Sequence, residues 1–171
     1  MFLDSLRYIG IGLLLLILQF FLLEQINFGT WIQPMPYIYL IFILPFSMNR
    51  FVKLSIAFFL GFSLDSIGNT YGMHAAAAST LCFVKTYADD WFLDKDAIQL
   101  QGFNYVTPAY KGNPFFIRYT LIYIYIHHLL FFVLDYFKWS SGFTILFVAA
   151  LSSLITFLFI LLFRLVNPNK T

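Results

Sequence analysis

Two shortages in the sequence, of charged residues and of cysteine, limit the kind of protein it can encode. Asp, Glu, Lys and Arg make up 11% of the 171 residues, against about 25% in a typical soluble domain. A soluble domain of this length buries only part of its apolar surface, whereas 61% of these residues are hydrophobic. The single cysteine, Cys82, excludes an intramolecular disulfide and a cysteine-based metal cluster. The composition therefore predicts an integral membrane protein.

Signatures of catalysis and of nucleic-acid binding are also missing. The net charge is only +2 and the basic residues are scattered, which argues against a nucleic-acid partner. The chain contains no P-loop, H-E-x-x-H helix, dinucleotide fingerprint or nucleophile elbow. The segment "GFSLD" has the wrong glycine pattern for a nucleophilic serine. We expect a protein that is not an enzyme and that holds no metal or cofactor.

Long apolar runs take the place of these signatures. They are continuous and lack the alternation of barrel strands, so they predict an all-α membrane protein with a single domain. The first run is too long for a signal-peptide core and is interpreted as a retained helix. Pro45 is expected to end or kink the second helix. Six transmembrane helices are predicted, at residues 5–23, 35–48, 51–67, 71–87, 115–137 and 142–165, with a long loop at 88–116.

The distribution of basic residues predicts the orientation of these helices, because cytoplasmic loops are rich in Lys and Arg. With the N-terminus inside, only Lys138 lies on the outer side. Both termini and the loop 88–116 are then cytoplasmic. The segment "DDWFLDKD" in that loop could lie along the membrane or bind a protein, and its acidic character favours a protein. The residues placed inside are Arg7, Arg50, Lys53, Lys85, Lys95, Lys111, Arg118, Arg164 and Lys170.

Three acidic residues, Glu24, Asp65 and Asp135, fall near the outer ends of predicted helices. Glu24 and Asp135 are interpreted as solvated at the interface. Asp65 lies deeper, and we expect it to accept hydrogen bonds from backbone N–H groups at the start of the fourth helix.

Glycines surround Asp65 at a spacing that suits close packing. Gly61, Asp65, Gly68 and Gly72 are separated by four, three and four positions, so they would share one face of an uninterrupted helix. Small residues let membrane helices approach closely. The pair Gly68–Asn69 also suits a turn. The sequence leaves open whether this tight site packs within the protein or against a partner's helix.

Polar side chains also fall in the middle of the last two predicted helices. His127 and His128 lie in the fifth, and Ser152 and Ser153 lie at a similar depth in the sixth. They predict hydrogen bonds between helices, as does Gln19 in the first. A proton relay or a metal site is the alternative, but no acid or third ligand lies at that depth on these helices.

The stretch "LGFSLDSIGNTYGMHAAAASTLCFVKTY" resembles the signature region of the rod shape-determining protein family MreD. "TLIYIYIHHLLFFVLDYF" and "IQPMPYIYLIFILPF" resemble the fifth and second helices of its members from Bacteroidetes-type bacteria. The resemblance covers most of the chain, but not residues 88–116. Its signature positions here are Gly61, Asp65, Gly68, Gly72, His74 and Ala75.

This resemblance implies a non-enzymatic component of the bacterial inner (cytoplasmic) membrane that regulates cell shape and lateral peptidoglycan synthesis. MreC is the expected main partner, with RodA, a class B penicillin-binding protein and MreB as further partners. The family's fold is similar to the six-helix substrate-binding components of energy-coupling-factor vitamin transporters. The alternative is therefore a solute-binding membrane protein, whose outward pocket would use Glu24, Trp31, Asp65, Asn69 and Asp135.

Overall fold

The computed structural model describes residues 2–23, 31–137 and 142–166, and every regular element in these ranges is helical. Helix α1 (Phe2–Ile17) continues into a π-helical segment, η1 (Leu18–Leu23). A 3-10 turn, η2 (Pro36–Ile38), leads into the short α2 (Tyr39–Ile43). The longer helices follow: α3 (Arg50–Gly68), α4 (Met73–Phe92), α6 (Pro108–Tyr136) and α7 (Gly142–Val166), with the short α5 (Lys95–Leu100) between α4 and α6.

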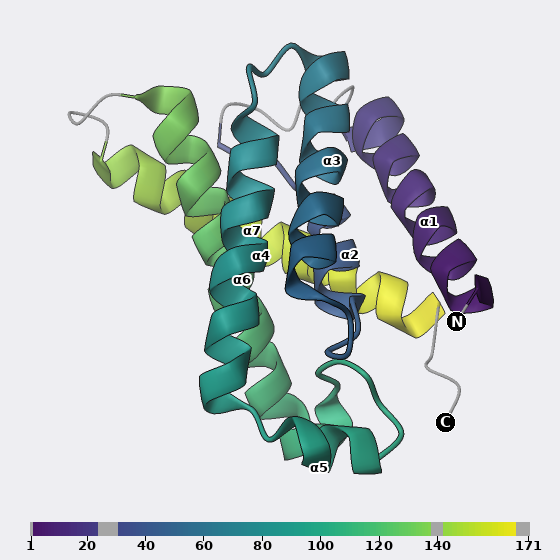
Figure 1. Ribbon diagram of the computed structural model, residues 1–171. Coiled ribbons are helices and arrows are strands. Elements are labelled where there is room, and N and C mark those ends of the chain that lie inside the picture. Colours follow the sequence, from purple (N-terminus) through teal and green to yellow (C-terminus); the bar gives the residue numbers. More distant parts are fainter. Residues whose placement is uncertain (1, 24–30, 138–141, 167–171) are drawn as a thin grey trace.

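The long helices pack in chain order. α3 and α4 form an antiparallel pair joined by a tight turn at the upper end in Figure 1, and α4 also packs on α6, which packs on α7. α3 begins, α4 ends and α6 begins at the lower end, where α5 lies (Figure 1). α7 is strongly tilted relative to α3 and α4.

Within the described residues, three helices, α3, α6 and α7, are long and apolar enough to cross a membrane. α4 has 20 residues but carries Lys85, Asp89 and Asp90 in its second half. The apolar part of the first helix, Tyr8–Phe21, is shorter. The structure thus indicates a helical membrane protein, while six crossings with both termini inside stay a prediction.

The helix predicted at residues 35–48 is much shorter in the structure. Regular helix ends at Ile43, because Leu44 precedes Pro45 and takes an extended conformation (φ −61°, ψ 130°), as a residue before proline prefers. Pro45 therefore ends the helix, as expected. Residues 34–44 are all buried except the half-buried Tyr39, so this segment fills the centre of the helix assembly.

The loop predicted at residues 88–116 is wrong over much of its length. α4 continues to Phe92, α5 occupies Lys95–Leu100 and α6 already begins at Pro108. Asp94 caps α5 by accepting a hydrogen bond of 2.9 Å from Ala97 N. α6 is interrupted at Lys111 and at Gly112, whose φ of +79° suits glycine. This polar stretch therefore contains capping and proline residues that are typical of helix starts. Hydropathy alone does not reveal these helices.

Candidate functional site

The junction between α3 and α4 is organised by the carboxylate of Asp65. Its Oδ1 accepts hydrogen bonds from His74 N (3.0 Å) and from the Thr70 hydroxyl (2.5 Å), and its Oδ2 accepts one from Ala75 N (2.8 Å). The Nδ1 of His74 also lies 3.1 Å from Oδ1. The two backbone donors belong to the first turn of α4, where N–H groups have no partner within the helix. The capping role expected for Asp65 is confirmed.

Gly61 lets α3 and α4 meet one turn away from Asp65. A Cβ atom at this position would lie 2.5 Å from the backbone C and O of His74 and 2.6 Å from the Cα of Ala75. These distances are well below ordinary carbon contacts of about 3.5–4.0 Å. The close approach that small residues predicted at Gly61 therefore occurs within the protein's own helix pair.

The helix face shared by Gly61, Asp65 and Gly68 ends with α3, and Gly72 does not continue it. α3 ends at Gly68, and the next residue, Asn69, is left-handed with φ +54°. Gly72 precedes α4 with φ +88° and has open space where a Cβ would be. The turn interpretation of these glycines is therefore correct, and the continuous-face interpretation is wrong for Gly72. His74, only 1% exposed, lies beneath the turn, and its Nε2 has no hydrogen-bond partner among the described residues.

His127 and His128 are fully buried, and each contacts another part of the chain. The Nε2 of His127 lies 2.8 Å from the Tyr37 hydroxyl, and the Nε2 of His128 lies 3.1 Å from the Thr156 hydroxyl. The hydrogen bond predicted between the fifth and sixth helices therefore exists, but it uses Thr156 of α7 and not the two serines. Ser153 instead donates to the carbonyl of Ala149 within its own helix.

Buried polar side chains of η1 and α7 form hydrogen bonds with the backbone of the non-helical segment ahead of α2. Ser152 Oγ accepts a hydrogen bond of 2.9 Å from Gln33 N, and Thr156 Oγ1 accepts one of 2.9 Å from Met35 N. Gln19 of η1 donates to the carbonyl of Pro34 at 3.2 Å. Non-helical backbone at membrane depth is tolerated only where other groups satisfy it. Gln19 and Ser152, which the sequence predicted as polar contacts, and Thr156, which it did not, therefore support this buried segment.

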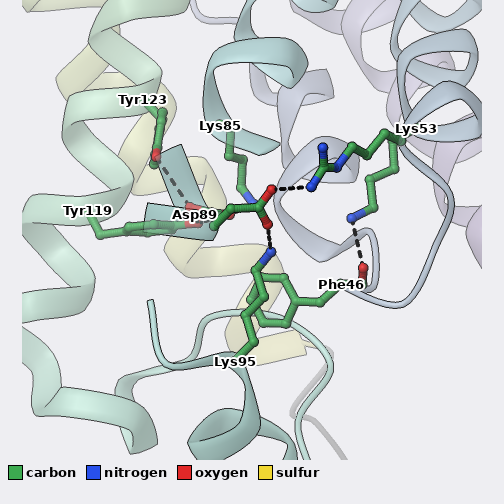
Figure 2. Close-up of polar contacts among 9 residues, drawn as sticks. Phe46, Lys53, Lys85, Asp89, Lys95, Tyr119 and Tyr123 are labelled. Atoms are coloured by element: carbon green, nitrogen blue, oxygen red, sulfur yellow. Dashed lines mark hydrogen bonds and ion pairs between the residues drawn. The ribbon is translucent and has the colours of Figure 1, made fainter. Parts of the chain in front are cut away.

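A charged cluster at the lower end of the helices was not predicted as a site. Asp89, only 2% exposed, accepts a hydrogen bond of 2.8 Å from Lys85 Nζ and bonds from the hydroxyls of Tyr119 and Tyr123 (Figure 2). The sequence placed Asp89 only as part of the cytoplasmic loop 88–116. The spacing of four between Lys85 and Asp89, which puts both on one helix face, was the available signal.

A second layer of the cluster lies closer to solvent. Arg50 donates to Asp90 at 2.6 Å, and Lys95 pairs with the same carboxylate. The hydrogen bond from Lys95, together with the charges of Lys95 and Arg50, lowers the pKa of Asp90. The Phe46 ring lies under the ammonium groups of Lys85 and Lys95, 5.9 and 5.5 Å from its centroid, a cation–π arrangement.

The remaining predicted residues do not converge on a pocket. Glu24 lies outside the described residues, Asp135 is exposed near the end of α6, and Trp31 is exposed. Among the described residues no group of three or more His, Cys, Asp or Glu side chains could hold a metal ion.

Comparisons with protein-family models, with curated proteins and with solved structures give no match for this chain. Its class therefore rests on the helical fold and the apolar helices alone, which indicate a membrane protein.

Proposed function

We propose that the protein is a non-enzymatic component of the bacterial elongation complex, of the MreD type, located in the inner membrane with both termini cytoplasmic. It regulates cell shape and lateral peptidoglycan synthesis by binding MreC, and through MreC the synthesis machinery of RodA, its class B penicillin-binding protein and MreB. The observation that carries the proposal is the α3–α4 junction. Four of the residues that resemble the MreD signature, Gly61, Asp65, His74 and Ala75, are buried there in mutual contact.

The hydrogen bonds and close contacts at this junction have a structural role. Asp65 is 6% exposed, and both of its oxygens already accept hydrogen bonds. A general base must lie within reach of a substrate, whereas Asp65 is buried and held by hydrogen bonds to its own helix junction. Gly61 lies against the backbone of α4. These residues fix the geometry of the α3–α4 pair, as a scaffold requires.

Because Gly61 is covered by α4, we assign the partner contact to a different surface of α4. Ala76, Thr80, Phe83 and Tyr87 are exposed and recur every three or four residues along α4, so they form one stripe. Ala76 and Thr80 are small, which allows the close approach of a membrane helix. The proposal assigns this stripe to the single membrane helix of MreC.

Cysteine crosslinking tests the assignment. Cysteines introduced at Ala76 and Thr80, in a background where the buried Cys82 is replaced by Ala, should crosslink to the membrane helix of MreC in cells. Leu154, on the exposed side of α7, supplies the control position, where no crosslink is expected. Crosslinks of equal yield at all three positions would refute the assigned surface.

A test in cells addresses the function itself. The bulky substitution Ala76→Trp should cause rounding of the source bacterium and loss of MreC co-purification, while Leu154→Trp should leave both unchanged. Normal cell shape after deletion of the whole gene would overturn the proposed function. Reading frames for MreB and MreC immediately upstream of the gene would add support.

The alternative is a solute-binding membrane protein, and this fold argues against the use of its main candidate residue, Asp65, in a pocket. Asp65 was its most deeply placed polar candidate, and the carboxylate is buried and accepts hydrogen bonds from Thr70, His74 and Ala75. Co-purification of a small molecule whose binding is lost in Asn69→Ala or Trp31→Ala would restore this alternative.

A further inference from the structure

A hollow of about 640 Å³ opens beside the charged cluster at the lower end of α3 and α4. Arg50, Lys53 and Lys95 line it together with a single carboxylate, Asp90. Arg50 and Lys95 both pair with Asp90. Since three cations share one carboxylate, the hollow carries surplus positive charge.

Lys53 is the unpaired cation of this group. The residue is only 7% exposed, yet within the described part of the chain no carboxylate lies within ion-pair distance of its ammonium. The ammonium has three donors, and one bonds to the Phe46 carbonyl at 3.2 Å (Figure 2). Burying an ammonium without an anion is costly, so the remaining donors call for an anionic acceptor.

The surroundings of Lys53 keep its ammonium at the hollow. The Phe46 carbonyl holds it on one side, and the Phe46 backbone N–H is itself fixed to the Asn104 carbonyl at 2.8 Å. Lys85, on the neighbouring helix α4, is already neutralised by Asp89. An anion entering the hollow would therefore meet Lys53 without displacing an existing ion pair.

The shape of the donor set favours a phosphate group. A guanidinium presents a fork of N–H donors and an ammonium a compact charge, and both bind phosphate oxygens well. The hollow lies where α3 begins and α4 ends, at the boundary of the apolar helices, and the exposed Phe51 and the Met48 side chain share its lining. A phosphate on an apolar tail fits this mixture better than a free ion.

We propose that the hollow lined by Arg50, Lys53 and Lys95 is a binding site for a phosphate-bearing anion, with Lys53 as its principal charge. The site goes beyond the proposed contact with MreC and does not depend on it. An anionic phospholipid headgroup and free phosphate offer the same chemistry.

Binding to the purified full-length protein in detergent tests the proposal. The probes are short-chain phosphatidylglycerol, short-chain phosphatidylcholine and inorganic phosphate, each titrated and followed by native mass spectrometry. Phosphatidylglycerol should bind in preference to phosphatidylcholine. Loss of one charge-assisted contact in Lys53→Gln should weaken its binding about tenfold or more, while Lys53→Arg, which keeps the charge, should retain most of it.

Matched variants keep the test decisive. Lys111 belongs to the same end of the protein but does not line the hollow, its ammonium lying over the rings of Tyr110 and Phe115, so Lys111→Gln should bind like the wild type. Lys95→Gln, at a half-buried position on α5, provides a second disruption if Lys53→Gln fails to fold. Inorganic phosphate that binds as tightly as the lipid, with the same dependence on Lys53, would support the site and assign it to a soluble phosphate. Equal losses in the Lys53 and Lys111 variants, or no binding of any probe, would overturn it.

Discussion

The substitution Gly61→Ala tests the α3–α4 junction most directly. The new Cβ would lie 2.5 Å from the backbone of His74 and 2.6 Å from Ala75 Cα, so the two helices must separate by about 1 Å to reach ordinary contact distances. The atoms that it meets are backbone, which cannot turn aside as a side-chain end can. The strain therefore acts on the whole junction.

The size of the effect follows from two contributions. Overpacking of this kind costs about 1–3 kcal/mol. Separation of the helices also stretches the hydrogen bonds of 3.0 and 2.8 Å from His74 N and Ala75 N to Asp65, and bonds to a charged group contribute about 1.5–3 kcal/mol each. The higher helix propensity of alanine returns at most about 1 kcal/mol. We expect a net loss of about 3 kcal/mol, or about a hundredfold in the unfolding equilibrium.

Equilibrium unfolding in mixed detergent micelles, followed by circular dichroism, measures this loss. Gly10→Ala is the matched control, since Gly10 lies inside α1 and a Cβ at this position would have no neighbouring atom within 4 Å. The control should be as stable as the wild type or slightly more stable. A Gly61→Ala protein with wild-type stability would show that the helices are not in close contact and would refute the account of the junction.

Three further substitutions have expected outcomes in the same assay. Asp65→Asn places an N–H group against the donor Ala75 N and should cost about 1–3 kcal/mol; a neutral result would contradict the capping role. Thr156→Val removes the acceptor of Met35 N and should cost about 1–3 kcal/mol, whereas a similar loss in the exposed control Thr80→Val would point to a general effect of the substitution. Asp89→Asn leaves buried Lys85 without its partner and should cost about 3–5 kcal/mol, and additional replacement of that lysine by Met should recover part of the loss; no recovery would contradict the ion-pair explanation.

Local signals predicted the α3–α4 junction well. Asp65, followed by "SIGNT" and an alanine-rich run, indicated an acid that caps the next helix, and the structure places its oxygens on the first N–H groups of α4. This succeeded because a cap and its helix lie within ten positions of each other in the chain. Turn chemistry depends on neighbouring residues, and a sequence displays those directly.

Contacts between distant segments were less predictable. Thr156 bonds to a backbone N–H 121 positions away, and Tyr119 reaches Asp89 across 30 positions. Hydropathy predicted a short helix at residues 35–48 that Pro45 ends or kinks, but it cannot show that a neighbouring helix supplies the missing backbone partners. It placed Asp89 in a cytoplasmic loop and did not predict its burial, because burial depends on which faces of α4 and α6 meet.

By itself the sequence determined that the chain is helical and suited to a membrane, since the length of an apolar run and the positions of Pro, Gly and Asx residues act locally. It also determined where α3 and α4 separate. Only the tertiary structure decided that Gly61 accommodates the protein's own α4, that buried polar groups support the segment before α2, and that Lys53 has no carboxylate partner among the described residues. These properties depend on which side chains meet across the fold, and such meetings are set by the packing of all the helices together.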